Sequence, residues 1–183
     1  MFARYPPPSR RVIFYAREAA LNAGAAAIDS SHLLAGLILE VAGRETDWYK
    51  LGERFPEETA RLRKMPRAAP KDIPLARDAR RVLALAEVEA NQLDCYWIDT
   101  DVLMLGMLRE RDCDAVAKLQ AAGLDIAEIR RHVSSYAGKQ EDYGPIPALW
   151  RWWKPVTRGG RMAGMMYLLF VFVLIKFLTG RGC

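Results

Sequence analysis

The side chains that most often carry chemistry are few in this 183-residue chain, and they form no recognisable set. His32 and His132 are the only histidines, and a lone histidine on a helix is more often packed or solvated than catalytic. The three cysteines, Cys95, Cys113 and Cys183, include no CxxC pair, so neither a disulfide framework nor a zinc knuckle is indicated. Because a metal site or a Cys/His dyad needs several converging ligands, we predict no metal, no cofactor and no catalytic site.

Acidic side chains near arginines are a second place to look for chemistry. Glu87, Glu89 and Glu128 have arginine neighbours in the sequence, and the simplest interpretation is a set of solvated helix faces with weak ion pairs. An enzyme with an unrecognised site stays open as an alternative. It would need a concave pocket in which two or more titratable groups converge.

A group of tryptophans near the C-terminal end could bind either nucleic acid bases or a membrane interface. Basic residues alternate with these tryptophans, and the apolar run Met162–Leu178 follows directly. Tryptophans with basic neighbours at the edge of an apolar run are typical of an interfacial anchor, so we predict a membrane and no nucleic acid. The predicted anchor residues are Trp150, Trp152, Trp153, Arg158, Arg161 and Lys176.

The apolar run itself predicts a transmembrane helix at residues 161–180. Seventeen residues of helix span about 26 Å, slightly less than a hydrocarbon core of ~30 Å, and Lys176 can extend towards the nearer surface. Four basic residues precede the run and only Arg181 follows it, which predicts a cytoplasmic N-terminal domain, as at a bacterial inner membrane. The alternatives are a C-terminal helix buried in the core, or a structural membrane protein that oligomerises through this tail.

An internal repeat shows which elements must position the remaining candidate residues. Moving Arg80–Glu110 back by 70 positions aligns it with Arg10–Glu40 without a gap, and ten of the 31 positions are identical. Chance would give about two or three identities in a chain this rich in Ala and Leu, so the repeat is real. The identical positions are Arg10/Arg80, Arg11/Arg81, Val12/Val82, Ala16/Ala86, Ala20/Ala90, Ile28/Ile98, Asp29/Asp99, Leu33/Leu103, Gly36/Gly106 and Glu40/Glu110.

Apolar residues at three- and four-residue steps predict helices and no strands. After a tail at residues 1–8, the first copy has a helix at 10–23 with Ser9 as N-cap, and a helix at 31–41 with Ser30 as N-cap. Gly36, in the middle of the second helix, indicates close helix packing. Weaker signals predict helices at 46–51 and from Pro56. The second copy has helices at 77–93, 101–109 with Thr100 as N-cap, 115–122 and 126–133.

Residues 9–135 resemble the Clp repeat, the amino-terminal domain of the Clp/Hsp100 chaperones, strongly in the second copy and over the first two helices of the first copy. Three series carry the resemblance: A-R-R-V-L-x-L-A, I-D-T-D-V-L-x-L-G-x-L and L-x-x-x-G-L-D-I-A-E-I-R-R-H-V. The resemblance implies an all-α fold of two pseudo-twofold related four-helix repeats. The expected organisation is a tail at 1–8, repeats at 9–64 and 77–135 joined by a linker at 65–76, a juxtamembrane linker at 136–160 and the transmembrane helix. The chain has no GxxxxGK[ST] loop, so we expect a free-standing N-domain without the ATPase modules.

The resemblance also suggests residues that could contact a partner. In those chaperones the second helix of each repeat opens with G-T-E-H, and in some members the glutamate helps to bind phosphorylated arginine. The matching positions here are Ser31, which lacks the carboxylate, and Asp101, which shortens it. We therefore favour a helix-starting role for these turns over phosphoarginine binding. Tyr96 and Trp97 would be natural anchors in a groove between the repeats.

These observations predict a membrane-tethered, non-enzymatic protein- or peptide-binding module. The resemblance implies client proteins, adaptors or Clp chaperone-protease components as the partner class. The net charge of +5 does not require nucleic acid, because its lysines and arginines are spread along the chain and partly gathered before the apolar tail, where anionic lipid is the better partner.

Overall fold

The computed structural model of the chain describes residues 2–44, 50–67, 72–136 and 143. These residues form eight α-helices and no strand beyond an isolated bridge, so the predicted all-α class with four helices per repeat is confirmed. The helices are α1 (Pro7–Asn22), α2 (Ser30–Val41), α3 (Leu51–Arg54), α4 (Pro56–Arg63), α5 (Arg77–Gln92), α6 (Thr100–Arg109), α7 (Asp114–Ala121) and α8 (Ile126–Tyr136).

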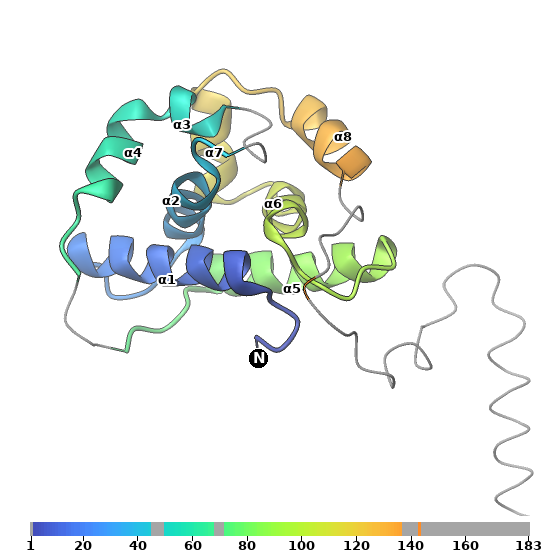
Figure 1. Cartoon of the computed structure of the whole chain (residues 1–183), viewed down its shortest axis with the longest axis horizontal. Coiled ribbons are helices and arrows are strands. Elements are labelled where there is room, and N and C mark those ends of the chain that lie inside the picture. The colour runs from blue at the N-terminus through green and yellow to red at the C-terminus, as the bar shows by residue number, and fades with distance from the viewer. Residues whose placement is uncertain (1, 45–49, 68–71, 137–142, 144–183) are drawn as a thin grey trace, which may run out of the picture. The chain divides into compact units, whose positions relative to one another are not determined.

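The two central helices, α2 and α6, organise the domain. They are seen end-on in Figure 1, with α1 and α5 on one side and α3, α4, α7 and α8 on the other. Helix α1 packs mainly on α2, and α5 packs mainly on α6. Since α2 and α6 meet helices on opposite sides, they are almost wholly apolar, and residues such as Leu33, Leu37 and Leu103 are fully buried.

A glycine at the same place in α2 and α6 allows each helix pair to approach closely. A Cβ atom on Gly36 would collide with the carbonyl oxygen of Val12 in α1. A Cβ atom on Gly106 would lie 2.5 Å from the backbone nitrogen of Ala86 in α5. The structure thus confirms the close packing predicted for Gly36 and explains why both copies have glycine here.

The two repeats also exchange backbone hydrogen bonds. The Ile28 N–H donates to the Pro74 carbonyl oxygen at 2.8 Å, and the Ala76 N–H donates to the Ile28 oxygen at 2.8 Å. The Ile98 N–H donates to the Arg4 oxygen at 2.8 Å. Arg4 and Pro74 are separated by the same 70 positions as Ile28 and Ile98, so the segment before each repeat pairs with the helix connection of the other.

The start of α1 corrects the prediction made from Ser9. The helix begins at Pro7, with Pro6 as the N-cap residue, and Ser9 lies buried inside the first turn. Proline is tolerated there because first-turn amides have no intrahelical acceptor. Within the described residues the Ser9 hydroxyl has no hydrogen-bond partner, so it caps nothing.

The second half of the first repeat is the least regular part of the domain. Helix α4 starts at Pro56, as predicted, but α3 contains only four residues, and most of the helix expected at 46–51 lies outside the described residues. Among the described helices, none combines the length and apolar character needed to cross a bilayer. The chain divides into Met1–Pro145 and Ile146–Cys183, and the predicted transmembrane helix and its tryptophan anchor belong to the second unit, outside the described residues.

Candidate partner-binding surface

The starts of α2 and α6 are held by aspartates, one position before the predicted caps. The Asp29 carboxylate accepts a hydrogen bond from the His32 N–H at 3.0 Å, and the Asp99 carboxylate accepts one from the Val102 N–H at 2.9 Å. Ser30 and Thr100 are therefore the first helical residues, and their prediction as caps was wrong by one position. Asp and Ser cap about equally well, so sequence preference alone did not separate them.

Ser31 and Asp101 occupy equivalent places in the first turns of α2 and α6, and both are half-buried. A carboxylate in a first turn lies close to the positive end of the helix dipole, which favours Asp101 at this site. Their positions agree with a helix-starting role, and their contact with a partner stays a prediction.

Ser30 has a structural role between the repeats. Its N–H donates to the Asp78 carboxylate at 2.9 Å, and its hydroxyl oxygen accepts a hydrogen bond from the Ala115 N–H at 3.4 Å. Burial acts to raise the pKa of Asp78, but the hydrogen bonds from Ser30 and from the start of α5 outweigh it and leave that pKa below its ordinary value. The residue thus joins the starts of α2, α5 and α7.

Tyr96 is not the exposed anchor that the sequence suggested. It is buried, and the Arg4 guanidinium lies 5.7 Å from its ring centroid and donates to the backbone oxygens of Tyr96 and Cys95 at 2.8 and 3.0 Å. The N-terminal segment covers this connection because it pairs with Ile98. Trp97 is half-buried, and its ring meets those of Tyr96 and Tyr143 edge to face at 4.7 and 6.3 Å.

The thiols and histidines of the described residues form no reactive set. Burial raises the pKa of Cys95 to about 11 and also raises the pKa of Cys113, which keeps both thiols protonated at neutral pH. His32 lies 2.7 Å from the Asp29 carboxylate within the cap of α2. In this part of the chain no three metal-binding side chains cluster.

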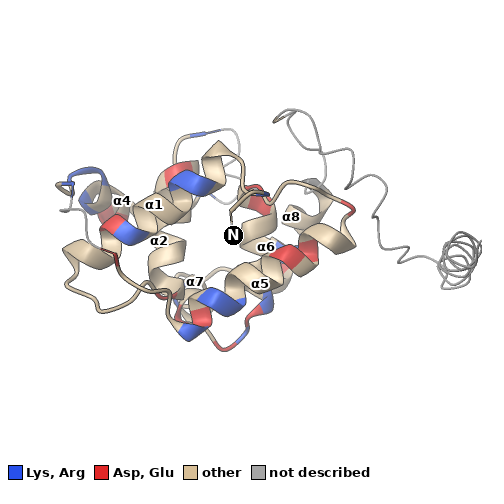
Figure 2. Cartoon of the chain, turned by 90° about the horizontal axis from the view of Figure 1, so that it is seen from below, with Lys and Arg blue, Asp and Glu red and all other residues tan. Residues whose placement is uncertain are grey.

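Glu89 corrects the prediction that the acidic residues form solvated helix faces with weak ion pairs, and two further glutamates also pair between helices. Figure 2 shows both signs of charge along α1 and α5, and several of these groups pair across helices. Glu40 binds Arg11, and Glu110 binds Arg81 at 3.0 Å, which are equivalent pairs in the two repeats. Glu89 is 5% exposed, and it accepts hydrogen bonds from Arg109 at 3.1 Å and Arg130 at 2.6 Å. Glu87 is exposed, as predicted.

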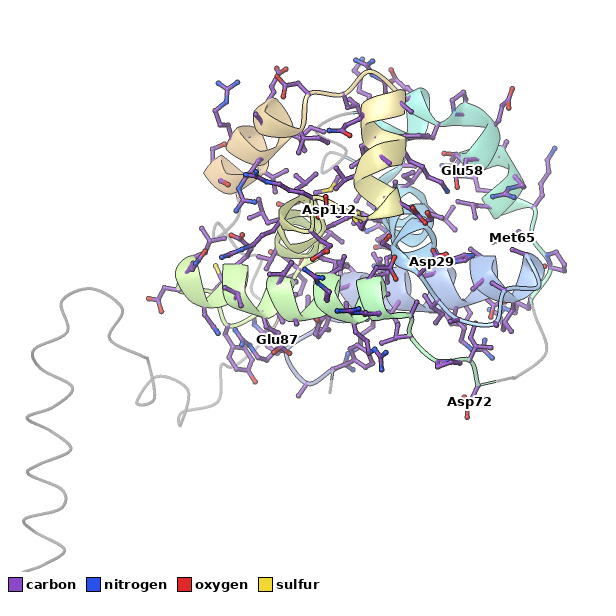
Figure 3. The ribbon with its side chains drawn as sticks, turned by 180° about the vertical axis from the view of Figure 1, so that it is seen from behind. Asp29, Glu58, Met65, Asp72, Glu87 and Asp112 are labelled. Atoms are coloured by element: carbon purple, nitrogen blue, oxygen red, sulfur yellow. The ribbon has the colours of Figure 1, made fainter. Side chains whose placement is uncertain are left out.

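A groove of about 570 Å³ opens in the first repeat. Helices α1 and α4 both pack on α2, and the groove runs between them over Leu39. Phe14 projects at its edge with 44% of its surface exposed, and its ring meets that of Tyr15 at 5.7 Å. Figure 3 places Met65 where the end of α4 comes near α1. The lining residues are Arg11, Phe14, Tyr15, Glu18, Leu39, Leu62, Arg63, Met65, Pro66 and Arg67.

Sequence reasoning missed this groove because it followed only the apolar face of the first helix. Phe14 and Tyr15 lie off that face. The three- and four-residue steps in the sequence predict that the face consists of Val12, Ile13, Ala16, Ala19, Ala20 and Ala23. Two consecutive aromatics beside a periodic core face were the available signal. Its meaning depended on where α4 packs, and the weak helix signals of that region did not reveal this.

Comparison with known proteins places these features in a family. The profile described as the Clp repeat (R) N-terminal domain matches residues 4–122. The chain is 31% identical over 147 residues to "Chaperone protein ClpC, chloroplastic" of Pisum sativum, covering 78% of this chain and 16% of that protein. It is 28% identical over 145 residues to "Negative regulator of genetic competence ClpC/MecB" of Bacillus subtilis (strain 168), covering 77% and 18%. The chain thus spans about a sixth of the length of these relatives.

Solved structures share the same fold. The N-terminal domain of the caseinolytic protease associated chaperone ClpD from Arabidopsis thaliana superposes with a TM-score of 0.60 at 21% identity, covering 76% of this chain and 97% of that domain. The Hsp104 N-terminal domain from Candida albicans gives a TM-score of 0.54 at 20% identity, covering 75% and 93%. With the family profile matching most of the described domain, the chain belongs to the Clp repeat N-terminal domain family.

Proposed function

We propose that this protein is a non-enzymatic binding module that recruits protein or peptide partners. The observation that carries the proposal is the Clp N-domain fold, which covers 97% of the ClpD N-terminal domain. Since a fold does not define a function, the open groove of the first repeat is the second support, because it offers exposed apolar side chains and charge without a set of catalytic groups.

Client proteins or Clp chaperone-protease components are the partner class that we propose. The matched relatives include a "Chaperone protein ClpC" and an "ATP-dependent Clp protease ATP-binding subunit ClpA homolog" of Guillardia theta, 30% identical over 143 residues. This chain matches 16% and 18% of their lengths, which is a region of the size of one N-terminal domain. Binding, rather than a motor activity, is what a domain of this kind can contribute.

The apolar C-terminal segment would hold this module at the cytoplasmic face of a membrane. The support is the sequence: residues 162–178 are apolar apart from Lys176, three tryptophans with basic neighbours precede them, and basic residues are concentrated on the N-terminal side. A tethered module would raise the local concentration of its partner at the membrane surface without a chemical step of its own.

Proximity crosslinking of the full-length protein in its native membrane, followed by mass spectrometry, tests the proposal. We expect recovery of a defined protein partner, such as a Clp component or its clients, above a control that uses an unrelated tail-anchored protein of similar abundance. Recovery of only the protein itself and lipids would contradict the binding function.

A further inference from the structure

One difference between the two repeats lies among helices that pack in the same way in both. Helices α5 and α8 of the second repeat both pack on α6, as α1 and α4 pack on α2. Glu89 of α5, Arg109 of α6 and Arg130 of α8 meet between them, since the Glu89 carboxylate accepts from both guanidinium groups. An ion-pair triad therefore fills this position of the second repeat.

The first repeat replaces every member of this triad by an apolar residue. The offset of 70 positions also relates α4 to α8, which begin at Pro56 and Ile126. The counterparts of Glu89, Arg109 and Arg130 are then Ala19, Leu39 and Ala60. A small apolar cluster lies here, in which Ala19, Ala35 and Leu62 are buried while Leu39 and Met65 are only partly covered. The groove between α1 and α4 therefore has an apolar floor that no side chain of this repeat covers completely.

The charge around this floor is positive. Arg11, Arg63 and Arg67 line the groove, and Glu18 is the one carboxylate among its described lining residues. Arg11 is paired with Glu40, so the positive charge presented to the groove comes mainly from Arg63 and Arg67. Glu18 is 6% exposed and pairs with Arg17 at 2.7 Å, so it presents little negative charge to the groove. Arg63 and Arg67 are exposed on the α4 side. A ligand with carboxylates beside an apolar side chain complements this arrangement.

We propose that the groove between α1 and α4 of the first repeat binds an acidic peptide segment of a partner protein, through an apolar anchor side chain placed over Leu39 and Met65 beside Phe14. This inference rests on the proposed binding function and names its site and ligand chemistry. The chain's own segment 150–161 does not fit, because it carries four basic residues, Arg151, Lys154, Arg158 and Arg161, and no acidic one.

Fluorescence anisotropy with the full-length chain tests the ligand class. The probe is the fluorescein-labelled peptide Gly-Glu-Glu-Phe-Leu-Glu-Glu-Gly, compared with one peptide in which Lys replaces each Glu and another in which Ala replaces Phe and Leu. We expect saturable binding of the acidic probe that weakens with added salt, and at least about tenfold weaker binding of the other two. Equal binding of the lysine peptide, or no saturable binding of the acidic probe up to about 1 mM, overturns the proposal.

Substitutions locate the site. Phe14→Ala should weaken binding of the acidic probe about tenfold, and Leu39→Arg, which introduces the Arg109 counterpart, should abolish it. Val88→Ala is the matched control for Phe14→Ala, because Val88 is an exposed apolar residue on α5 of the second repeat. The affinity of the Val88→Ala chain for the acidic probe should stay within about twofold of that of the unsubstituted chain. Unchanged binding in both Phe14→Ala and Leu39→Arg overturns the proposal.

Charge reversal separately tests the exposed arginines at the α4 side of the groove. Arg67→Glu should weaken the acidic probe about threefold or more and remove most of its salt dependence, whereas Arg131→Glu, on an exposed position of α8, should not. Each variant is first checked for an unchanged unfolding midpoint. If crosslinking recovers a partner equally with Phe14→Ala and Val88→Ala, the proposed function stands and the groove is not its site. If no partner is recovered from the native membrane while the peptide binds, the proposed recruiting function is wrong, but the groove is still a binding site for acidic peptides.

Discussion

The residues that are identical in the two repeats have different structural roles, and the structure shows which role each pair has. Asp29 and Asp99 are helix caps, and Gly36 and Gly106 permit close helix contact. Arg11/Arg81 and Glu40/Glu110 give two equivalent interhelical ion pairs. The sequence revealed these positions because both copies retain them. It did not reveal Tyr96 as buried or Glu89 as paired, since these depend on the N-terminal segment and on three separate helices.

Replacement of Gly36 by Ala should destabilise the domain by about 2–3 kcal/mol or more, because the new Cβ meets the backbone of α1 rather than a side chain that could move. Gly24→Ala is the comparison, because its Cβ would enter open space and only its positive φ of 67° opposes the change, at a cost of about 1 kcal/mol. Urea unfolding followed by circular dichroism measures both. A Gly36→Ala chain as stable as the Gly24→Ala chain would show that α1 and α2 can separate freely.

Asp78 should make stability depend on pH in the acid range. Its pKa in the folded chain is below the ordinary value of 3.8, so its contribution is present above that pH and is lost as the pH falls through the folded pKa. Asp78→Asn should therefore lower stability at pH 7 by about 1 kcal/mol, since the site is partly solvated, and the deficit should shrink as the pH falls below 3.8. Thermal unfolding at several pH values measures it.

The control is Asp72→Asn. Asp72 is exposed, lies before α5 and is distant from the contact between Ser30 and Asp78 (Figure 3). This substitution should leave the dependence of stability on pH unchanged. A deficit for Asp78→Asn that stays constant from pH 7 to pH 3 would mean that packing of the side chain, and not its charge, explains the effect.

At the scale of elements, the apolar period and the internal repeat predicted most of the helices. The exact helix starts depended on which of two neighbouring residues acts as the N-cap. The apolar period placed α5 and α6 within one residue at each end, because long amphipathic patterns determine which face is buried. Asp29 and Ser30 are both good caps, so α2 and α6 start one residue earlier than predicted. The groove was not predictable in this way, because one of its walls is α4, whose short pattern specifies packing weakly.

The attachment of α8 should depend on Glu89. Glu89→Gln removes the charge that holds Arg109 of α6 and Arg130 of α8, and the cost should be about 1–2 kcal/mol, because both arginines are partly exposed and can be rehydrated. Hydrogen exchange followed by mass spectrometry should show faster exchange in α8 than in α5 or α6.

Glu87→Gln is the matched control, two residues away on α5, with its side chain directed away from the other helices (Figure 3). It should leave exchange in α8 unchanged. Uniformly faster exchange across all helices in Glu89→Gln would instead assign the triad to global stability rather than to the docking of α8.

At the scale of the whole molecule, the described helices bury a continuous core built from both repeats, with Val12, Leu33, Val82 and Leu103 all at 0% exposure. Among the described residues, the buried members of this core run from Tyr5 to Val133. A domain with its own core and reciprocal backbone bonds between its repeats should fold without the C-terminal segment. Membrane attachment through the C-terminal segment stays a proposal that rests on its sequence.

Deletion of residues 161–183 should release the protein from membranes without unfolding it. The full chain should sediment with membranes and resist extraction by alkaline carbonate. The truncated chain should stay in the supernatant, with a free energy of unfolding within about 0.5 kcal/mol of that of the full chain. Leu169→Asp combined with Val173→Asp is the control that keeps the length, because each carboxylate at the centre of a bilayer costs about 2.5–3.5 kcal/mol, more than the apolar run can offset. Release of both chains as helical, monodisperse proteins supports the tether. Aggregation of both would mean that the apolar segment completes the fold of the domain, and the membrane part of the proposed function would then be wrong.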